Sequence, residues 1–133
     1  MGIRTSADYD SLWTLAALDA VTTMVLTQDF RHIELSVFSS SITTWYTLTV
    51  YGSDQNDRPD LSSAVSATNR YGEIQVVDKN DWNAITGTTG IVITANWLKK
   101  YEVNDNKSRW VGVKITAYTD GSSVPTINLA DNS

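Results

Sequence analysis

Strict alternation of apolar and polar residues is the strongest pattern in this chain. It extends over residues 30–38, 43–51 and 109–119 with a period of two, which is typical of β-strands that bury one face. The rows expected to face a core are Ile33, Leu35 and Val37; Tyr46, Leu48 and Val50; and Val111, Val113, Ile115 and Ala117. The pattern therefore predicts three long strands, each with one face in a hydrophobic core.

Shorter runs of β-branched and aromatic residues predict further strands over residues 21–26, 65–69, 71–78, 91–95, 101–103 and 124–129. Turn-forming residues separate them, and two polar segments, 52–64 and 78–90, are long enough to be loops. We expect an all-β fold, a single antiparallel β-sandwich that is jelly-roll-like.

Three details of strand pairing are also predicted. Residues 30–38 and 43–51 are expected to form an antiparallel pair through their short Ser/Thr connection, and Asp120-Gly121 is a hairpin turn signal. Pro125 cannot donate a main-chain hydrogen bond, which favours an edge position for the last strand.

The N-terminal segment fits two interpretations. Residues 10–20 place Leu12, Leu15 and Leu18 at roughly helical spacing, which indicates a short helical turn, but the segment could equally be an extended arm that touches a neighbour. We divide the chain into an N-terminal arm, residues 1–20, and a sandwich domain, residues 21–133.

Composition supports the β prediction and excludes several functions. The chain has 17 Thr and 14 Ser but only three Glu, which suits strands and turns better than helix surfaces. The net charge is −5 and Lys99-Lys100 is the only adjacent basic pair, so we expect no nucleic-acid partner. No apolar run reaches the length of a membrane span, and the absence of cysteine suits folding in a cytosolic environment.

Residues that could carry chemistry are few and scattered. His32 is the only histidine, and Glu34, Glu73 and Glu102 show no spacing that marks a catalytic pair. We therefore expect no enzyme, no catalytic residue and no cofactor, and keep a small hydrolase only as a third hypothesis. Aspartates recur in two loops (Asp54, Asp57 and Asp60; Asp78 and Asp81, with Asn80), which leaves open a structural calcium ion or ordinary turn residues.

Aromatic side chains stand on the predicted outer faces. Trp45, Tyr51, Trp110 and Tyr118 alternate with the aliphatic rows, so they are expected to point away from the core. They must be covered by loops or the arm of the same chain, by a ligand such as a sugar, or by a protein partner.

The order of several motifs resembles small virion proteins of tailed bacteriophages. The resemblance covers residues 30–119 and is carried by Phe30-Arg31-His32, Val50-Tyr51-Gly52-Ser53 before Pro59-Asp60, Thr68-Asn69, Ile74-Gln75-Val76-Val77-Asp78, Ile85 with Gly87 and Gly90, Tyr101-Glu102-Val103-Asn104 and Arg109-Trp110-Val111. These motifs are structural, and they bring no active-site residue with them.

The resemblance implies a capsid decoration or cement protein. Its partner would be the major capsid protein, its location the virion and its state a homotrimer. We expect docking through the arm and one sheet face, with Tyr9, Trp13, Trp45 and Trp110 as contact residues. The alternative is a tail- or fibre-associated module that binds carbohydrate or a receptor, with Trp45 or Trp110 as the sugar platform.

Overall fold

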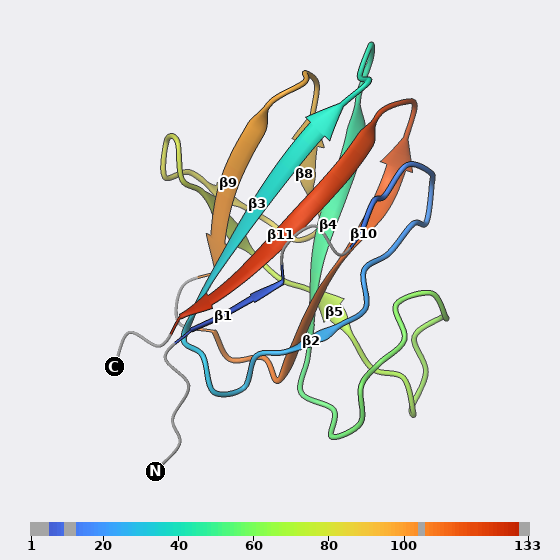
Figure 1. The fold of residues 1–133 in the computed structure, drawn as a ribbon. Coiled ribbons are helices and arrows are strands. Elements are labelled where there is room, and N and C mark those ends of the chain that lie inside the picture. Colours follow the sequence, from blue (N-terminus) through green and yellow to red (C-terminus); the bar gives the residue numbers. More distant parts are fainter. Residues whose placement is uncertain (1–5, 10–12, 104–105, 131–133) are drawn as a thin grey trace.

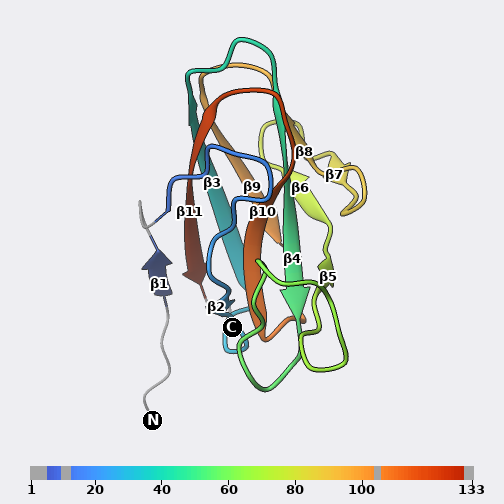
Figure 2. The same cartoon turned by 90° about the vertical axis from the view of Figure 1, so that its right-hand side faces the viewer.

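The computed structural model describes residues 6–9, 13–103 and 106–130, which form a sandwich of two antiparallel sheets (Figures 1 and 2). Sheet A contains, in spatial order, β1 (Ser6–Tyr9), β11 (Ser122–Ala130), β3 (His32–Ser40), β9 (Leu98–Val103), β6 (Val76–Asp78) and β7 (Ala84–Ile85). Sheet B contains β2 (Val25–Leu26), β10 (Trp110–Tyr118), β4 (Tyr46–Ser53) and β5 (Gly72–Glu73), and β8 (Ile91–Ile93) also pairs with β4. The expected all-β sandwich is confirmed. The described residues include no helix, and so none that is long and apolar enough to cross a membrane.

Two connections cross from one sheet to the other, where the sequence predicted pairs within a sheet. β3 pairs with β11 and β9, whereas β4 pairs with β10, so the predicted pairing of residues 30–38 with 43–51 is wrong. The Asp120-Gly121 turn likewise joins β10 of sheet B to β11 of sheet A and is not a hairpin. The physical reason is burial, because the aliphatic rows of β3 and β4 cover each other only when the strands lie in opposite layers. The pair β4–β10 is thus nested in sequence within the pair β3–β11, as in a jelly roll.

The core lies between the two sheets and contains every residue of the predicted rows except Ala117, which a bulge in β10 turns outward. Val37, Leu48, Val113 and Ile115 have no exposed surface, and aliphatic residues of β8 and β11 complete the layer. At about 25 cal/mol per Å² of apolar surface, this layer is the main favourable contribution to folding.

A β-bulge reverses the prediction for the end of β10. The register shifts between Ile115 and Ala117, so Tyr118 lies opposite the fully buried Tyr46 rather than on the outer face. An extra residue on one strand moves every later side chain to the other face. Tyr118 therefore packs against the core and donates its hydroxyl to the carbonyl of Gly121 at 3.0 Å.

The N-terminal segment lies along the sandwich and contains no helix among its described residues. β1 pairs with β11, and Leu15, which is 2% exposed, exchanges two main-chain hydrogen bonds with Ser123. Residues 19–22 then bond the outer edge of β10 through Asp19 and Thr22. The helical interpretation of residues 13–20 is wrong, because Leu15 and Asp19 bond to sheet edges and these residues hold a single turn, from Ala17 to Ala20. Residues 10–12 lie outside the described residues.

The long loop after β4 covers part of the outer face of sheet B. Leu61 and Met24 are buried there against Gly112, whose missing side chain leaves the space that the Leu61 methyl group occupies. Residues 65–69 do not form the predicted strand, since they hold only an isolated bridge between Ser66 and Asn69. The loop thus has a small apolar cluster of its own.

Two other strand predictions need correction. The predicted strand 71–78 is divided between β5 in sheet B and β6 in sheet A, and β7 falls within the predicted loop 78–90. Pro125 lies in β11, which β1 flanks at residues 127–130, so β11 is not an edge strand along its whole length. The Ser123 N–H donates to Leu15, on the side of β11 away from β3. Main-chain groups two residues apart point in the same direction, so the Pro125 nitrogen also points away from β3, and the pairing with β3 needs no N–H there.

Candidate docking surface

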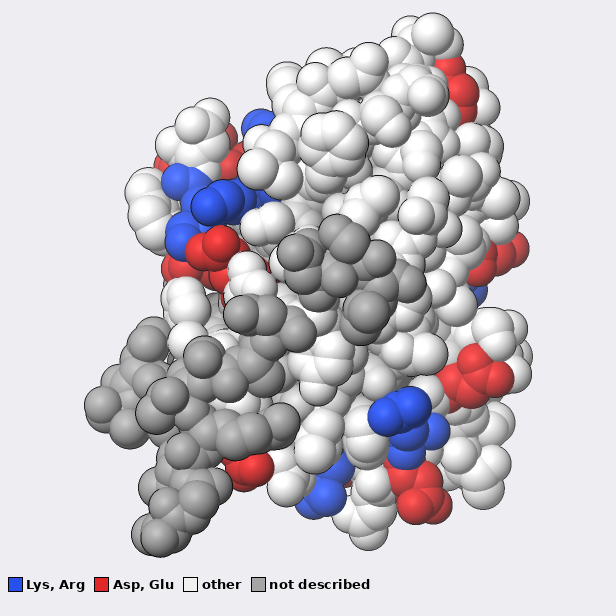
Figure 3. Space-filling model, viewed as in Figure 1, with Lys and Arg blue, Asp and Glu red and all other residues white. Residues whose placement is uncertain are grey.

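The outer face of sheet A is divided into a charged half and an apolar half. Residues of β3 on this face lie directly opposite residues of β9 and β11, which builds rows across three strands. One row contains Glu34 and Glu102, and the row at the end of β3 contains Val124, Phe38 and Leu98. Figure 3 shows uncharged residues over the upper part of this face and basic and acidic residues gathered at its left side.

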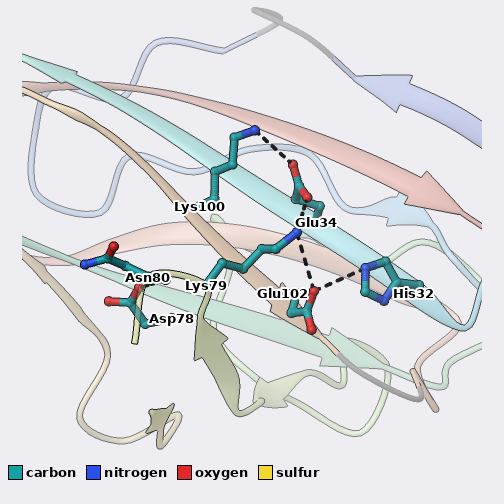
Figure 4. Close-up of polar contacts among 7 residues, drawn as sticks. All are labelled: His32, Glu34, Asp78, Lys79, Asn80, Lys100 and Glu102. Atoms are coloured by element: carbon teal, nitrogen blue, oxygen red, sulfur yellow. Dashed lines mark hydrogen bonds and ion pairs between the residues drawn. The ribbon is translucent and has the colours of Figure 1, made fainter. Parts of the chain in front are cut away.

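The charged half is a cluster of five side chains, which we call the charged cluster: His32, Glu34, Lys79, Lys100 and Glu102 (Figure 4). Lys79, from the turn after β6, places its Nζ 2.7 Å from Glu34 Oε2 and 3.7 Å from Glu102 Oε2. The Glu102 carboxylate also lies 3.3 Å from His32 Nε2. Lys79 thus stands between two carboxylates that face each other across neighbouring strands.

Proton affinities within the charged cluster follow from this geometry. The hydrogen bond from Lys79 lowers the pKa of Glu34 below its ordinary value, with further lowering from Lys100 and His32. The same hydrogen bond raises the pKa of Lys79. Both groups are therefore charged at neutral pH, and the cluster has the character of an ion-pair network.

Metal binding receives no support from the described aspartates. In the described part of the chain, no group of three or more His, Cys, Asp or Glu side chains is arranged to hold an ion. The Asp60 carboxylate accepts hydrogen bonds from Ser62 and Ser63, and Asp78 accepts one from the Asn80 main chain. These contacts are those of ordinary turn residues, which was the other interpretation of the sequence.

Exposed apolar side chains surround the end of the sandwich where β3 ends and β4 and β9 begin, with Phe38 and Leu98 on the outer face of sheet A and Val92 on that of sheet B. The structure describes eight large hydrophobic residues as exposed, and five of them lie at this end. We call these five the distal apolar end: Phe38, Trp45, Val92, Trp97 and Leu98. Phe38 is 53% exposed and Leu98 is 59% exposed, although they lie directly opposite each other. A concentration of this kind is typical of a surface that binds a partner.

Three of the four predicted contact residues pack against their own chain. Tyr9 and Trp13 stack with ring centroids 6.5 Å apart, and both pack against the core. The Trp110 indole N–H donates to the Gln55 carbonyl at 2.8 Å, and the Arg58 guanidinium lies 5.4 Å from the ring centroid. The loop after β4 therefore covers Trp110.

Trp45 differs from the other three because it is 40% exposed and belongs to the distal apolar end. It directly precedes β4, whereas Trp110 pairs with the last residue of that strand, so the two tryptophans lie at opposite ends of the sandwich. The sequence missed Phe38, Trp97 and Leu98. A signal for Phe38 was present, since it is an apolar residue on the polar side of its strand.

Comparisons with known proteins show the fold. No protein-family model and no curated protein matches the sequence. Among solved structures, the chain is similar to the SPBc2 prophage-derived protein YomS, with a TM-score of 0.62 and 13% identity over 94% of this chain and 93% of that one. The two chains therefore share one architecture over nearly their whole lengths, despite very different sequences.

Proposed function

We propose that this chain is a non-enzymatic structural protein of a tailed-bacteriophage virion, which binds the capsid surface as a decoration or cement protein. The observation that carries the proposal is the distal apolar end, where five large apolar side chains are exposed on a folded sandwich. Two further observations support the proposal: the chain shares its fold with a prophage-derived protein, and the order of its motifs resembles that of phage virion proteins. The partner in this proposal is the major capsid protein, and the chain folds in the host cytoplasm before mounting on the particle.

A structural role fits the charged cluster better than catalysis does. A carboxylate pair that works as acid and base needs one member to keep a proton. Here Lys79 lies within 4 Å of both carboxylates, and the pKa of Glu34 is lowered, so that carboxyl group has lost its proton at neutral pH.

Docking in this proposal uses the distal apolar end rather than the N-terminal segment. Leu15 is part of the core, and Tyr9 and Trp13 pack on it. Deletion of residues 1–20 would remove these contacts and would not separate docking from folding. Point substitutions on the exposed end avoid this problem.

The test is cosedimentation of the purified protein with capsids that lack it. Phe38→Thr keeps a strand-forming residue and removes an exposed aromatic ring, so we expect an unchanged melting temperature and roughly ten-fold weaker binding. Val65→Thr is the matched control, because Val65 is 58% exposed but lies in the loop at the other end of β4. Equal binding by Phe38→Thr and the unsubstituted chain would contradict the proposed surface, and failure of the unsubstituted chain to bind capsids would contradict the function.

Trimer formation is part of the same proposal. Light scattering of the purified protein at several concentrations, and of decorated particles, gives the mass directly. A mass three times that of the chain is expected. A monomeric mass both in solution and on particles would contradict the trimer.

The exposure of Trp45 favours a second candidate, a tail- or fibre-associated module that binds carbohydrate. Its indole is 40% exposed, whereas Arg58 and Gln55 engage Trp110. A glycan array in which hits disappear with Trp45→Ala would support this function over capsid binding.

A further inference from the structure

A cleft of about 430 Å³ opens on sheet A where β6 ends beside β9. It is lined by Lys79, Asn80, Trp97, Leu98, Lys99 and Lys100, and we call it the β9 cleft. β6 pairs with β9 only at Tyr101 and Glu102, and one further hydrogen bond joins the Lys79 N–H to the Lys100 carbonyl at 3.0 Å. The part of β9 before Lys100 therefore pairs with β3 on one edge, and no described strand pairs with its other edge.

The open edge presents main-chain groups to the cleft. The Trp97 carbonyl accepts a hydrogen bond from Ser39 in the direction of β3. Because main-chain groups alternate in direction along an antiparallel strand, the N–H and C=O of Leu98 point the other way, as the Lys100 carbonyl does. Within the described ranges, no residue bonds these two groups of Leu98. A free pair of this kind is what an added strand uses.

The charge of the cleft lining is opposite to that of the chain. Three of the five lysines of this acidic protein line the cleft. The Lys100 side chain is 53% exposed and its Nζ lies 3.8 Å from Glu34, so N–H donors remain for a ligand. Lys99 Nζ lies 3.7 Å from Asp78 and 4.6 Å from the centroid of the Trp97 ring.

We propose that the β9 cleft binds an extended acidic peptide segment of a partner protein. The main chain of Leu98 exchanges hydrogen bonds with the peptide backbone. Alternate side chains of β9 point to opposite faces, so Leu98 and Lys100 contact one face of the peptide and Trp97 and Lys99 the other. On each face the lysine binds a carboxylate and the apolar side chain contacts an apolar group. The unbonded N–H and C=O of Leu98 favour a peptide over an acidic polysaccharide, because a strand edge recognises another backbone. This goes beyond the proposed function, since it specifies the chemistry of the bound segment whichever protein carries it.

An array of end-blocked random hexapeptides, probed with the purified full chain, tests the proposal. Bound peptides are expected to be enriched in Asp and Glu beside one apolar residue. Loss of one partly exposed ion pair weakens binding by about five-fold, so Lys100→Gln should do this to the selected peptides. Lys107→Gln, which makes the same charge change outside the cleft, should leave binding unchanged.

Leu98→Pro isolates the main-chain contact, because it removes the N–H on the open side and leaves the β3 side bonded. Leu98→Pro should abolish peptide binding and leave the melting temperature unchanged, whereas Leu98→Thr should retain most of the peptide binding. If Leu98→Pro does not fold, the Lys100→Gln variant decides. Absence of acidic peptides among those bound, or equal binding by the Lys100→Gln and Lys107→Gln variants, would overturn the proposal. So would preferential binding of oligogalacturonate, which would identify an acidic saccharide as the ligand. Capsid binding by Phe38→Thr is measured separately, so the failure of either proposal can be distinguished.

Discussion

Replacing Lys79 by methionine should destabilise the sandwich by leaving two carboxylates opposite each other. Glu34 and Glu102 are direct cross-strand partners, and their side chains are only 22% and 6% exposed. Like charges in this position repel, and Lys79 compensates both. Breaking a fully buried pair costs about 3–5 kcal/mol and an exposed pair below about 1 kcal/mol, so for this half-buried group we expect about 2 kcal/mol.

The effect should depend on pH in a defined direction. Lys79 lowers the pKa of Glu34, so this stabilisation is fully present above the ordinary glutamate pKa and is lost as the pH falls through the lowered value. The difference between Lys79→Met and the unsubstituted chain should therefore be largest near pH 7 and shrink in acid. For a chain of this length, about 2 kcal/mol corresponds to a melting temperature lower by about 7 °C.

Guanidinium unfolding followed by tryptophan fluorescence measures both effects, at pH 7 and at pH 3. Lys107→Met is the control for loss of a positive charge elsewhere. A Glu34→Gln substitution in the Lys79→Met background should restore part of the lost stability, because it removes the repulsion. A loss under about 0.5 kcal/mol at pH 7, or an equal loss at both pH values, would refute the account of the charged cluster.

Three further predictions concern the connections and the loop. Gly121 has φ 109°, and a Cβ there would lie 2.6 Å from Ile42, so Gly121→Ala should lower the free energy of unfolding by about 1–3 kcal/mol. Gly72 is the control: a Cβ there would meet open space, so Gly72→Ala should change the free energy of unfolding by under about 0.5 kcal/mol. Asp120 accepts hydrogen bonds from the Thr43 hydroxyl and from the N–H groups of Thr43 and Thr44 in the β3–β4 connection, and these bonds, the hydroxyl's above all, lower its pKa. Asp120→Ala should therefore reduce the melting temperature at pH 7 and lose this effect in acid. Leu61→Ala should cost about 2–3 kcal/mol in the same denaturation assay, because Leu61 is 2% exposed.

The sequence alone determined the three long strands and, up to the bulge in β10, which of their side chains face the core. Both properties are local, since a period of two along a strand assigns alternate residues to opposite faces wherever the strand pairs. The buried rows of β3, β4 and the first part of β10 follow that rule. Phe38, an apolar residue on a polar face, carried a local signal for the docking surface as well.

Tertiary structure alone decided the partner of each strand. A two-residue turn signal such as Asp120-Gly121 indicates a change of direction but does not say whether the chain returns in the same sheet or the opposite one. That choice depends on which aliphatic rows can cover each other, and those rows lie far apart in the sequence. The bulge that turned Tyr118 inward is decided in the same way, by the partner strand.

The two candidate sites depend on tertiary structure for the same reason. Lys79 reaches Glu34 only because β6 lies beside β9 and β9 beside β3, a path of 45 residues along the chain. The open edge at Leu98 exists because β6 is shorter than the strand it flanks. Alternation fixes the direction of each side chain from its neighbours in sequence, whereas ion pairs, clefts and free edges are properties of segments that meet only after the sheets have formed.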